Sequence, residues 1–357
     1  VSEGTWAPTA GGASVVVLDV NTGDVLAMYS YPAFDPNALN PNNNHPLTAA
    51  GDNYLNYVFS SPLKPLLNRA TQGEYAPGSL FKLVTIITTL ESGVFEPDST
   101  YTCTGVWNGL GNFVRRDWLE GGHGELTLMQ GLTASCNPWF YEMGMRTGQK
   151  DFELLPHYAR EFGFGSKLGI QIAESSGVIP DPDWLWQTMG QEWTLDNSIN
   201  MAIGQGDVQV TPLQIASLVA AVANGGTVYR PQLVDRIGLI AEEPSVITEP
   251  EVLYEPDVSP ETLQLVREAM HGVTSNMEIG TAEYRLGSLQ MAVAGKTGTA
   301  EVGGDRYPHA WFAGFAPYEN PEIAIAVMVE NGGQGSSVAA PIFRRIVERY
   351  YNLPVLD

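Results

Sequence analysis

Two segments of the chain place a serine three residues before a lysine, a spacing that lets the lysine amine act on the serine hydroxyl. They are Ser61–Lys64 and Ser79–Lys82. On a helix, side chains at positions i and i+3 share a face. A serine alcohol needs a neighbouring base to become a nucleophile, and a lysine whose pKa is lowered by burial can supply one. The spacing therefore indicates covalent catalysis through an acylated serine.

The surroundings of the two serines favour Ser79. Prolines lie within and directly after Ser61–Lys64, which predicts a loop. Ser79 instead follows Pro77-Gly78 and opens an apolar, helix-periodic segment that runs to Leu90. At a helix start, backbone N–H groups lie beside a developing oxyanion. The four-residue pattern is common, so it does not establish catalysis alone.

A second candidate element is Ser135-Cys136-Asn137, in a region from about residue 126 to 163 that we expect to be mostly helical. A hydroxyl at this place can pass a proton between a lysine and a leaving amine, and the amide can orient a substrate backbone. The same spacing recurs at Ser198-Ile199-Asn200, so the triplet is weak by itself.

The third element, Lys296-Thr297-Gly298-Thr299, lies in a segment that we expect to be a strand. Side chains alternate along a strand, so Thr297 and Thr299 share a face and can bind a carboxylate. Gly298 lets a peptide approach the backbone closely, and Lys296 adds positive charge to an acidic chain. The alternative is an edge strand whose lysine deters aggregation.

The elements that must position these residues are strands at the two chain ends and helices between them. Two β-rich runs, Ser14–Val20 and Val25–Tyr31, flank the turn sequence Asn21-Thr22-Gly23-Asp24, which predicts a hairpin. Further strands are expected at 291–302, 309–318 and 322–331, helices at 79–90, 211–223, 260–272 and 340–351, and a loop at 32–53.

Sequential strands joined by short turns favour an antiparallel sheet. We therefore expect an α/β (α+β) fold in which one antiparallel sheet, built from both chain ends, is flanked by helices beside a helical subdomain at about residues 95–225. Residues 1–13 are expected to be the remnant of a linker, and residues 14–357 a single catalytic domain.

Composition limits the classes of partner. The chain has 357 residues and a formal net charge of −22, and such a surface repels phosphate backbones, so we expect no nucleic-acid partner. No stretch approaches the roughly 18 apolar residues of a membrane span. The chain begins at Val1 rather than Met, so we expect it to be a fragment that lacks an N-terminal part.

The three elements in this order resemble penicillin-binding proteins and serine β-lactamases. Further segments strengthen the resemblance to penicillin-binding proteins, which extends from about Ser14 to Tyr351. These segments are Asn68-Arg69-Ala70, Tyr75-Ala76-Pro77-Gly78-Ser79, Gly204-Gln205-Gly206, Thr211-Pro212-Leu213-Gln214 and Ala310-Trp311-Phe312-Ala313-Gly314-Phe315-Ala316-Pro317. The resemblance implies the transpeptidase fold of that family. We find no deacylating glutamate on an omega loop, which a class A β-lactamase would need.

Within the family, Arg116-Asp117-Trp118 followed by Gly121-Gly122-His123-Gly124 resembles the class B, elongation-type penicillin-binding protein 2 group. That group usually has Ser-x-Asp, whereas this chain has Asn137. Because of this departure, membership of the division-type group or of another class B group stays open.

The resemblance implies a mechanism. Lys82 would deprotonate Ser79, which attacks the penultimate D-Ala carbonyl of a peptidoglycan stem peptide, with the backbone N–H groups of Ser79 and Thr299 as the oxyanion hole. Ser135 and Lys296 would pass a proton to the leaving amine. The substrate carboxylate would bind Thr297 and Thr299, and its peptide carbonyl would bind Asn137. An amine of a neighbouring stem peptide then resolves the acyl-enzyme into a cross-link. β-Lactams would stall at the acyl stage.

Some penicillin-binding protein 2 members hold zinc near the active site, and the resemblance suggests Cys103, Asp117, His123 and Cys136 as ligands here. Two cysteines, an aspartate and a histidine form a reasonable tetrahedral zinc set. A Cys103–Cys136 disulfide, natural outside the cytoplasm, is the alternative. Two unrelated buried thiols beside a satisfied histidine are the third possibility. No cofactor is required for the acyl-transfer chemistry itself.

The resemblance further implies an extracytoplasmic location with a membrane anchor in an N-terminal region absent from this chain, and a membrane glycosyltransferase as partner of the full-length protein. Two other functions stay open at this point. One is a D,D-carboxypeptidase that uses water as acceptor, and the other is a non-catalytic, penicillin-binding regulatory module.

Overall fold

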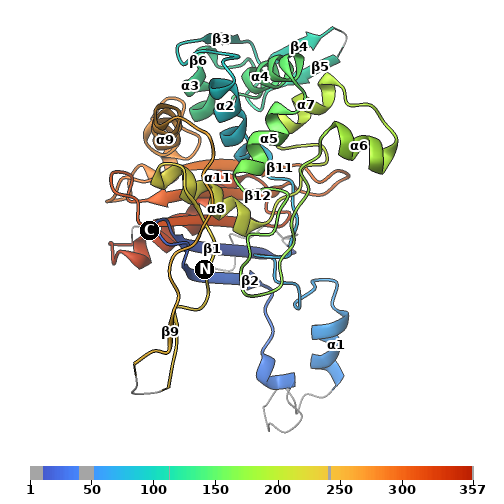
Figure 1. Cartoon of the computed structure of the whole chain (residues 1–357). Coiled ribbons are helices and arrows are strands. Elements are labelled where there is room, and N and C mark those ends of the chain that lie inside the picture. Colours follow the sequence, from blue (N-terminus) through green and yellow to red (C-terminus); the bar gives the residue numbers. More distant parts are fainter. Residues whose placement is uncertain (1–10, 40–51, 112, 240–242, 356–357) are drawn as a thin grey trace.

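The frame of the molecule, seen in a computed structural model, is a five-stranded antiparallel sheet built from both ends of the chain (Figure 1). Its strand order is β11-β12-β13-β1-β2, so the C-terminal strands pair directly with the N-terminal hairpin. The strands are β1 (Ala13–Asp19), β2 (Val25–Tyr31), β11 (Ala294–Ala300), β12 (His309–Ala316) and β13 (Ile323–Val329). The predicted fold class and all five predicted strands are confirmed.

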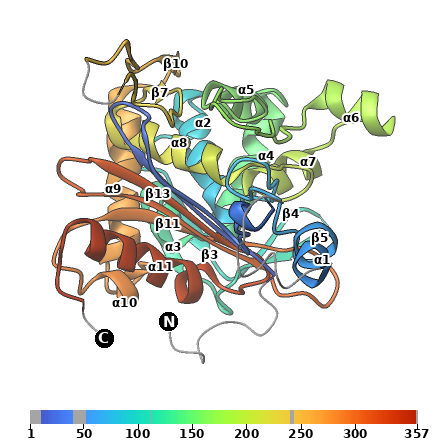
Figure 2. The same ribbon diagram turned by 90° about the horizontal axis from the view of Figure 1, so that it is seen from below.

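Helices cover both faces of this sheet (Figure 2). Every residue of β13 is buried, and successive residues point to opposite faces. Ile325 and Val327 pack in the same core as Phe343 of α11 (Gly335–Tyr350), whereas Ala326 and Met328 share a second core with Leu218 of α8 (Pro212–Asn224). The result is a three-layer arrangement with the sheet in the middle.

Most remaining helices lie above one end of the sheet (Figure 1). They are η2 (Gly78–Leu80), α2 (Lys82–Glu91), α3 (Leu128–Ala134), α4 (Asn137–Lys150), α5 (Leu154–Glu161), α6 (Pro182–Met189), α7 (Leu195–Ala202) and α9 (Pro260–Ser275), while η1 (Pro36–Leu39) and α1 (Asp52–Ser60) project from the opposite end. Helix α10 (Glu283–Leu286) instead lies beside α11 (Figure 2).

Short strand pairs complete the fold. They are β3 (Thr100–Cys103) with β6 (Gly124–Thr127), β4 (Val106–Leu110) with β5 (Phe113–Arg116), β7 (Val228–Tyr229) with β10 (Val252–Tyr254), and β8 (Arg236–Ile237) with β9 (Val246–Ile247). Those between residues 100 and 127 lie in the region expected to be helical. Four- or five-residue, half-exposed strands give too short a pattern to be detected.

The start of one helix differs from expectation, whereas both ends of another agree with it. Helix α11 begins at Gly335, ahead of the expected residue 340, with Pro341 inside it. Helix α8 agrees closely, because Thr211 and Gln214 form a capping box and Gly225 ends the helix at a φ of 93°.

The structure describes residues 11–39, 52–111, 113–239 and 243–355. Most of the expected linker remnant, and residues 40–51 of the expected loop, lie outside these ranges. Within them, no helix is both long and apolar enough to cross a bilayer.

Candidate active site

Ser79 lies on a short turn that precedes a helix, rather than in the helix itself. Gly78 has a φ of 53°, and its N–H donates to the Gly204 carbonyl (3.0 Å). The turn η2 follows, and α2 begins only at Lys82. The Ser79 side chain is therefore partly exposed, whereas Lys82 is fully buried one turn later. The helix expected from about Ser79 to Leu90 is confirmed as α2 (Lys82–Glu91), and Ser79 lies in the 3-10 turn that leads into it.

Glycines bring this turn into contact with strand β11. A Cβ at Gly78 would lie 2.6 Å from the Thr299 carbonyl oxygen, and a Cβ at Gly298 would lie 3.1 Å from the Pro77 carbonyl oxygen. A Cβ at Gly204 would lie 2.2 Å from the Gly78 oxygen. Gly298 was expected to let a peptide approach the backbone closely. In this structure, because glycine has no side chain, the turn that holds Ser79 can pack directly against β11 at this residue.

The Lys82 amine is the point where two of the three sequence elements meet. Its Nζ donates to the Ser135 carbonyl oxygen (2.8 Å) and to Asn137 Oδ1 (2.6 Å), and lies 3.2 Å from Ser135 Oγ. Burial lowers the pKa of Lys82 to about 8, and nearby Cys136 and Asp117 partly oppose this. The amine is therefore neutral in a large fraction of molecules at mildly alkaline pH. Among the described residues, no hydrogen bond joins it to Ser79; such bonds often tighten only when substrate binds.

Ser135 reaches Lys82 because the chain breaks there between two helices. Ser135 has a left-handed φ of 54° and ends α3, and Cys136 precedes the first residue of α4. Residues other than glycine rarely adopt this conformation, so the backbone of Ser135 is modestly strained. The expected position inside a helical region is confirmed, and the element lies at the junction of two helices within it.

Lys296 on β11 is also fully buried, and its Nζ donates to the Thr297 carbonyl (3.1 Å). Burial and the positive charge of Lys82 hold the pKa of Lys296 well below its ordinary value. Thr297 Oγ1 forms a hydrogen bond with Thr281 Oγ1 (2.8 Å), while Thr299 is exposed. The charge of Lys82 therefore acts on the Lys296 amine, and the pKa values of both lysines are lowered.

The two sequence decoys serve structural roles. Ser61 Oγ accepts from the Leu63 N–H in a loop. Ser198 Oγ accepts from Trp193 Nε1, and Asn200 Oδ1 accepts from Arg115, so both are occupied within and beside α7. The tertiary structure therefore separates each functional copy from its decoy.

The four candidate metal ligands converge beside this site. Their ligand atoms all lie within 4.8 Å of one another. Asp117 Oδ2 lies 2.8 Å from His123 Nδ1 and 3.3 Å from Cys103 Sγ, and that sulfur lies 3.8 Å from His123 Nδ1. Ligands of tetrahedral zinc lie about 3.3–3.8 Å apart for the usual bond lengths. Both cysteines are buried free thiols in this structure.

The cluster connects directly to the catalytic elements. The second oxygen of Asp117, Oδ1, accepts from the backbone N–H of Asn137 (3.1 Å). Burial raises the pKa of Cys136 far above its ordinary value, so the thiol is protonated unless a metal displaces the proton. The sequence pattern did not show the contact of Asp117 with Asn137, or that of Thr281 with Thr297, since both join residues distant along the chain.

Comparisons with known proteins agree with this geometry. Residues 13–348 match the penicillin binding protein transpeptidase domain. A peptidoglycan D,D-transpeptidase MrdA of Haemophilus influenzae is 32% identical over 358 residues, covering 95% of this chain and 53% of the relative. The chain therefore spans about half the length of this curated relative.

Solved structures are similar over nearly the whole chain. Pseudomonas aeruginosa PBP2 in complex with WCK 5153 has a TM-score of 0.82 and 33% identity, covering 95% of this chain and 73% of that one. A chain from a peptidoglycan synthase complex that coordinates polymerization and crosslinking has a TM-score of 0.83 and 34% identity, covering 96% of this chain and 56% of that one.

Proposed function

The chain belongs to the penicillin-binding protein transpeptidase family, and we propose that it cross-links peptidoglycan stem peptides through an acyl-enzyme on Ser79. The observation that carries the proposal is the Lys82 amine. It is fully buried, its pKa is lowered to about 8, and it contacts both Ser135 and Asn137 one turn after an accessible serine. Full burial, a lowered pKa and these two contacts together are typical of a lysine at a functional site rather than of a structural lysine.

In the proposed first step, neutral Lys82 accepts the proton of Ser79, whose oxygen attacks the penultimate D-Ala carbonyl. The backbone N–H groups of Ser79 and Thr299 stabilise the oxyanion, which the contact between the serine turn and β11 supports. Asn137 Oδ1 is held by Lys82, so its amide N–H₂ is free to donate to the substrate peptide carbonyl.

The second part of the step releases the terminal D-Ala. Ser135 Oγ, 3.2 Å from Lys82 Nζ, passes a proton to the leaving amine, and Lys296 supports this transfer with its buried amine. Thr297 and Thr299 hold the substrate carboxylate; the Thr281–Thr297 hydrogen bond orients the first of them. An amine of a second stem peptide then attacks the acyl-enzyme, and β-lactams, by forming the same acyl bond, act as inhibitors.

Covalent labelling with a fluorescent penicillin tests the proposal. The wild-type chain is expected to be labelled at Ser79, which peptide mass spectrometry identifies. A wild-type chain that is not labelled would remove the proposed function. Incubation of the full-length protein with a stem-peptide donor, with and without an amine acceptor, then distinguishes cross-linking from hydrolysis by its products.

We propose that Cys103, Asp117, His123 and Cys136 hold a structural zinc ion. The support is the spacing of their ligand atoms, in which His123 takes part through Nδ1, together with the chemistry of the set. When bound, zinc would keep both thiols deprotonated and brace the loop between α3 and α4.

Elemental analysis of protein purified under reducing conditions tests the zinc site. About one zinc per chain is expected, and about none in Cys103→Ser. Absence of zinc together with loss of both free thiols in a thiol titration would favour the disulfide instead.

We place the full-length protein on the outer side of the cytoplasmic membrane, with a membrane glycosyltransferase as partner. The support is the kinship with a peptidoglycan D,D-transpeptidase and with a chain of a peptidoglycan synthase complex. Fractionation of cells and co-purification of the full-length protein test this placement; recovery from the cytosol without a membrane partner would contradict it.

A further inference from the structure

The backbone just before Ser79 is tied to three other parts of the fold. Tyr75 and Val210 exchange backbone hydrogen bonds, each of 2.9 Å. Trp311 Nε1 on β12 donates to the carbonyl of Ala76 (3.2 Å), and Gly78 N–H is bound as described above. The position of the nucleophile therefore depends on how this segment is held.

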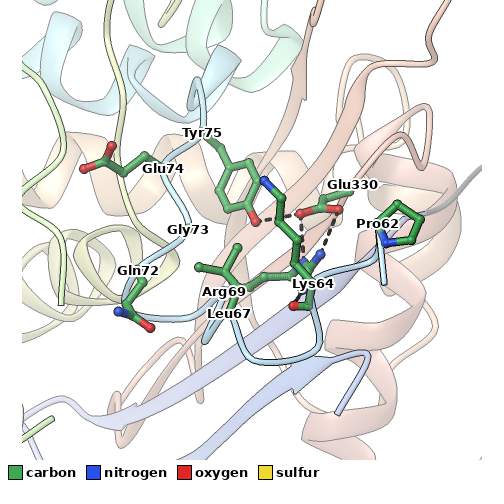
Figure 3. Close-up of a pocket in the computed structure, with 9 residues that line it drawn as sticks. All are labelled: Pro62, Lys64, Leu67, Arg69, Gln72, Gly73, Glu74, Tyr75 and Glu330. Atoms are coloured by element: carbon green, nitrogen blue, oxygen red, sulfur yellow. Dashed lines mark hydrogen bonds and ion pairs between the residues drawn. The ribbon is translucent and has the colours of Figure 1, made fainter. Parts of the chain in front are cut away.

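A buried charged network holds the one large side chain of this segment (Figure 3). The Tyr75 hydroxyl donates to Glu330 Oε1 (2.8 Å), and Arg69 Nε donates to the same oxygen (2.8 Å). Arg69 is only 2% exposed; its two terminal nitrogens donate to the carbonyls of Leu63 and Lys64, and one of them also donates to Glu330 Oε2 (3.4 Å). The guanidinium thus holds the Glu330 carboxylate in place through two of its nitrogens.

The sheet in turn sets the position of Glu330. This residue directly follows β13, and its N–H donates to the Gly12 carbonyl (2.7 Å) where β13 pairs with β1. The Tyr75 ring packs edge-on against His309 (5.3 Å between ring centroids) at the start of β12. The end of the central strand β13 is thereby connected to the serine segment through the Tyr75 hydroxyl.

We propose that Glu330, held by Arg69, is a positioning residue for acyl transfer, which acts through the Tyr75 hydroxyl to fix the segment before Ser79 against the Lys82 amine. The inference rests on the proposed function. A depression of about 410 Å³, lined in part by Arg69, Tyr75 and Glu330, opens beside the network. If the hydrogen bond is lost, the Tyr75 ring keeps its edge-on contacts with His309 and Trp311, but its polar end is no longer fixed beside the depression and the segment gains freedom.

The chain offers a matched control at the other end of β13. The Tyr351 hydroxyl donates to Glu322 Oε2 (3.1 Å) and to the Ala316 carbonyl (3.1 Å). This tyrosine–glutamate pair lies at the opposite end of the strand from Glu330. Tyr351→Phe therefore makes the same chemical change as Tyr75→Phe, at a place that is not connected to the segment before Ser79.

The experiment compares Tyr75→Phe with Tyr351→Phe by stopped-flow acylation with a fluorescent penicillin. For Tyr75→Phe, the acylation rate constant at saturating penicillin is expected to fall about ten-fold, while the half-saturating concentration and the melting temperature change little. Tyr351→Phe is expected to acylate at the wild-type rate. An unchanged rate constant in Tyr75→Phe, or an equal fall in both variants, would overturn the positioning role.

Rescue by a conservative variant provides the second readout. Glu330→Gln retains an oxygen that can accept from Tyr75, so its rate constant is expected to lie nearer to wild type than that of Glu330→Ala. Equal losses in the two folded variants would overturn the inference, and if Glu330→Ala does not fold, the tyrosine comparison decides. Failure of wild type to acylate would remove the proposed function, whereas acylation of wild type and Tyr75→Phe at one rate removes only the positioning role.

Discussion

Ser61–Lys64 and Ser79–Lys82 share one sequence pattern but differ in secondary structure, backbone conformation and burial. Lys64 is exposed in a loop with a positive φ of 49°, whereas Lys82 is fully buried at the start of a helix. Burial disfavours the charged amine and lowers the pKa of Lys82 to about 8, which supports its proposed role as a base. The difference indicates that the environment of a lysine, rather than its spacing from a serine alone, decides whether it suits this chemistry.

The largest expected effect tests the two serines directly. Ser79→Ala removes the attacking oxygen, so covalent labelling by a fluorescent penicillin is expected to disappear, as measured on a denaturing gel. Ser61→Ala is the matched control and is expected to label fully. Persistent labelling of Ser79→Ala, or its loss in Ser61→Ala, would reverse the comparison.

The two lysines provide the next test. Lys82→Met keeps an unbranched, apolar side chain in the buried position but removes the base, and the acylation rate constant is expected to fall about 10³-fold. Lys64→Met should acylate at the wild-type rate, because its amine lies in a loop away from the described contacts of Lys82. Equal rates in the two variants would show that Lys82 is not the base.

The two asparagines extend the comparison to the second element. Asn137→Ala removes an acceptor of the buried Lys82 amine and a candidate donor to substrate, and the acylation rate constant is expected to fall about 10- to 100-fold. Asn200→Ala breaks the contact with Arg115 and should lower the melting temperature instead. Acylation that is slowed more by Asn200→Ala than by Asn137→Ala would contradict the assignment.

The pH dependence of acylation is expected to show the smallest effect. Only the neutral amine can accept the serine proton, and the neutral fraction increases as pH rises through the lowered pKa of Lys82 of about 8. The acylation rate constant should therefore rise about ten-fold from pH 7 to pH 9 and then level off. A profile that falls with pH, in a range where circular dichroism shows the chain folded, would exclude Lys82 as general base.

Much of the fold follows from local pattern. The turn at Asn21–Asp24 and its flanking β-rich runs predicted the β1–β2 hairpin, and Thr211-Pro212 with Gly225 predicted both ends of α8. The small strands β3 to β6 and helix α1 were missed. They are short and partly exposed, so their pattern carries little information and tertiary contacts decide them.

The candidate site was predictable as a set of residues but not as an arrangement. The triplet Ser135–Asn137 was expected in a mostly helical region, but the pattern did not show the left-handed break at Ser135 that lets the Ser135 carbonyl and Asn137 face Lys82. The role of Glu330 had no sequence signal, since a single glutamate after a buried strand is an ordinary feature.

The sequence by itself determined the family, the sheet strands and the choice of Ser79 over Ser61, because periodicity, turn residues and short motifs act over neighbouring positions. Only the tertiary structure decided the pKa of Lys82, the contact of the serine turn with Gly298, the gathering of four ligand residues, and the link from Glu330 to Tyr75. Each of these depends on distances between residues far apart along the chain, which packing of the whole fold sets.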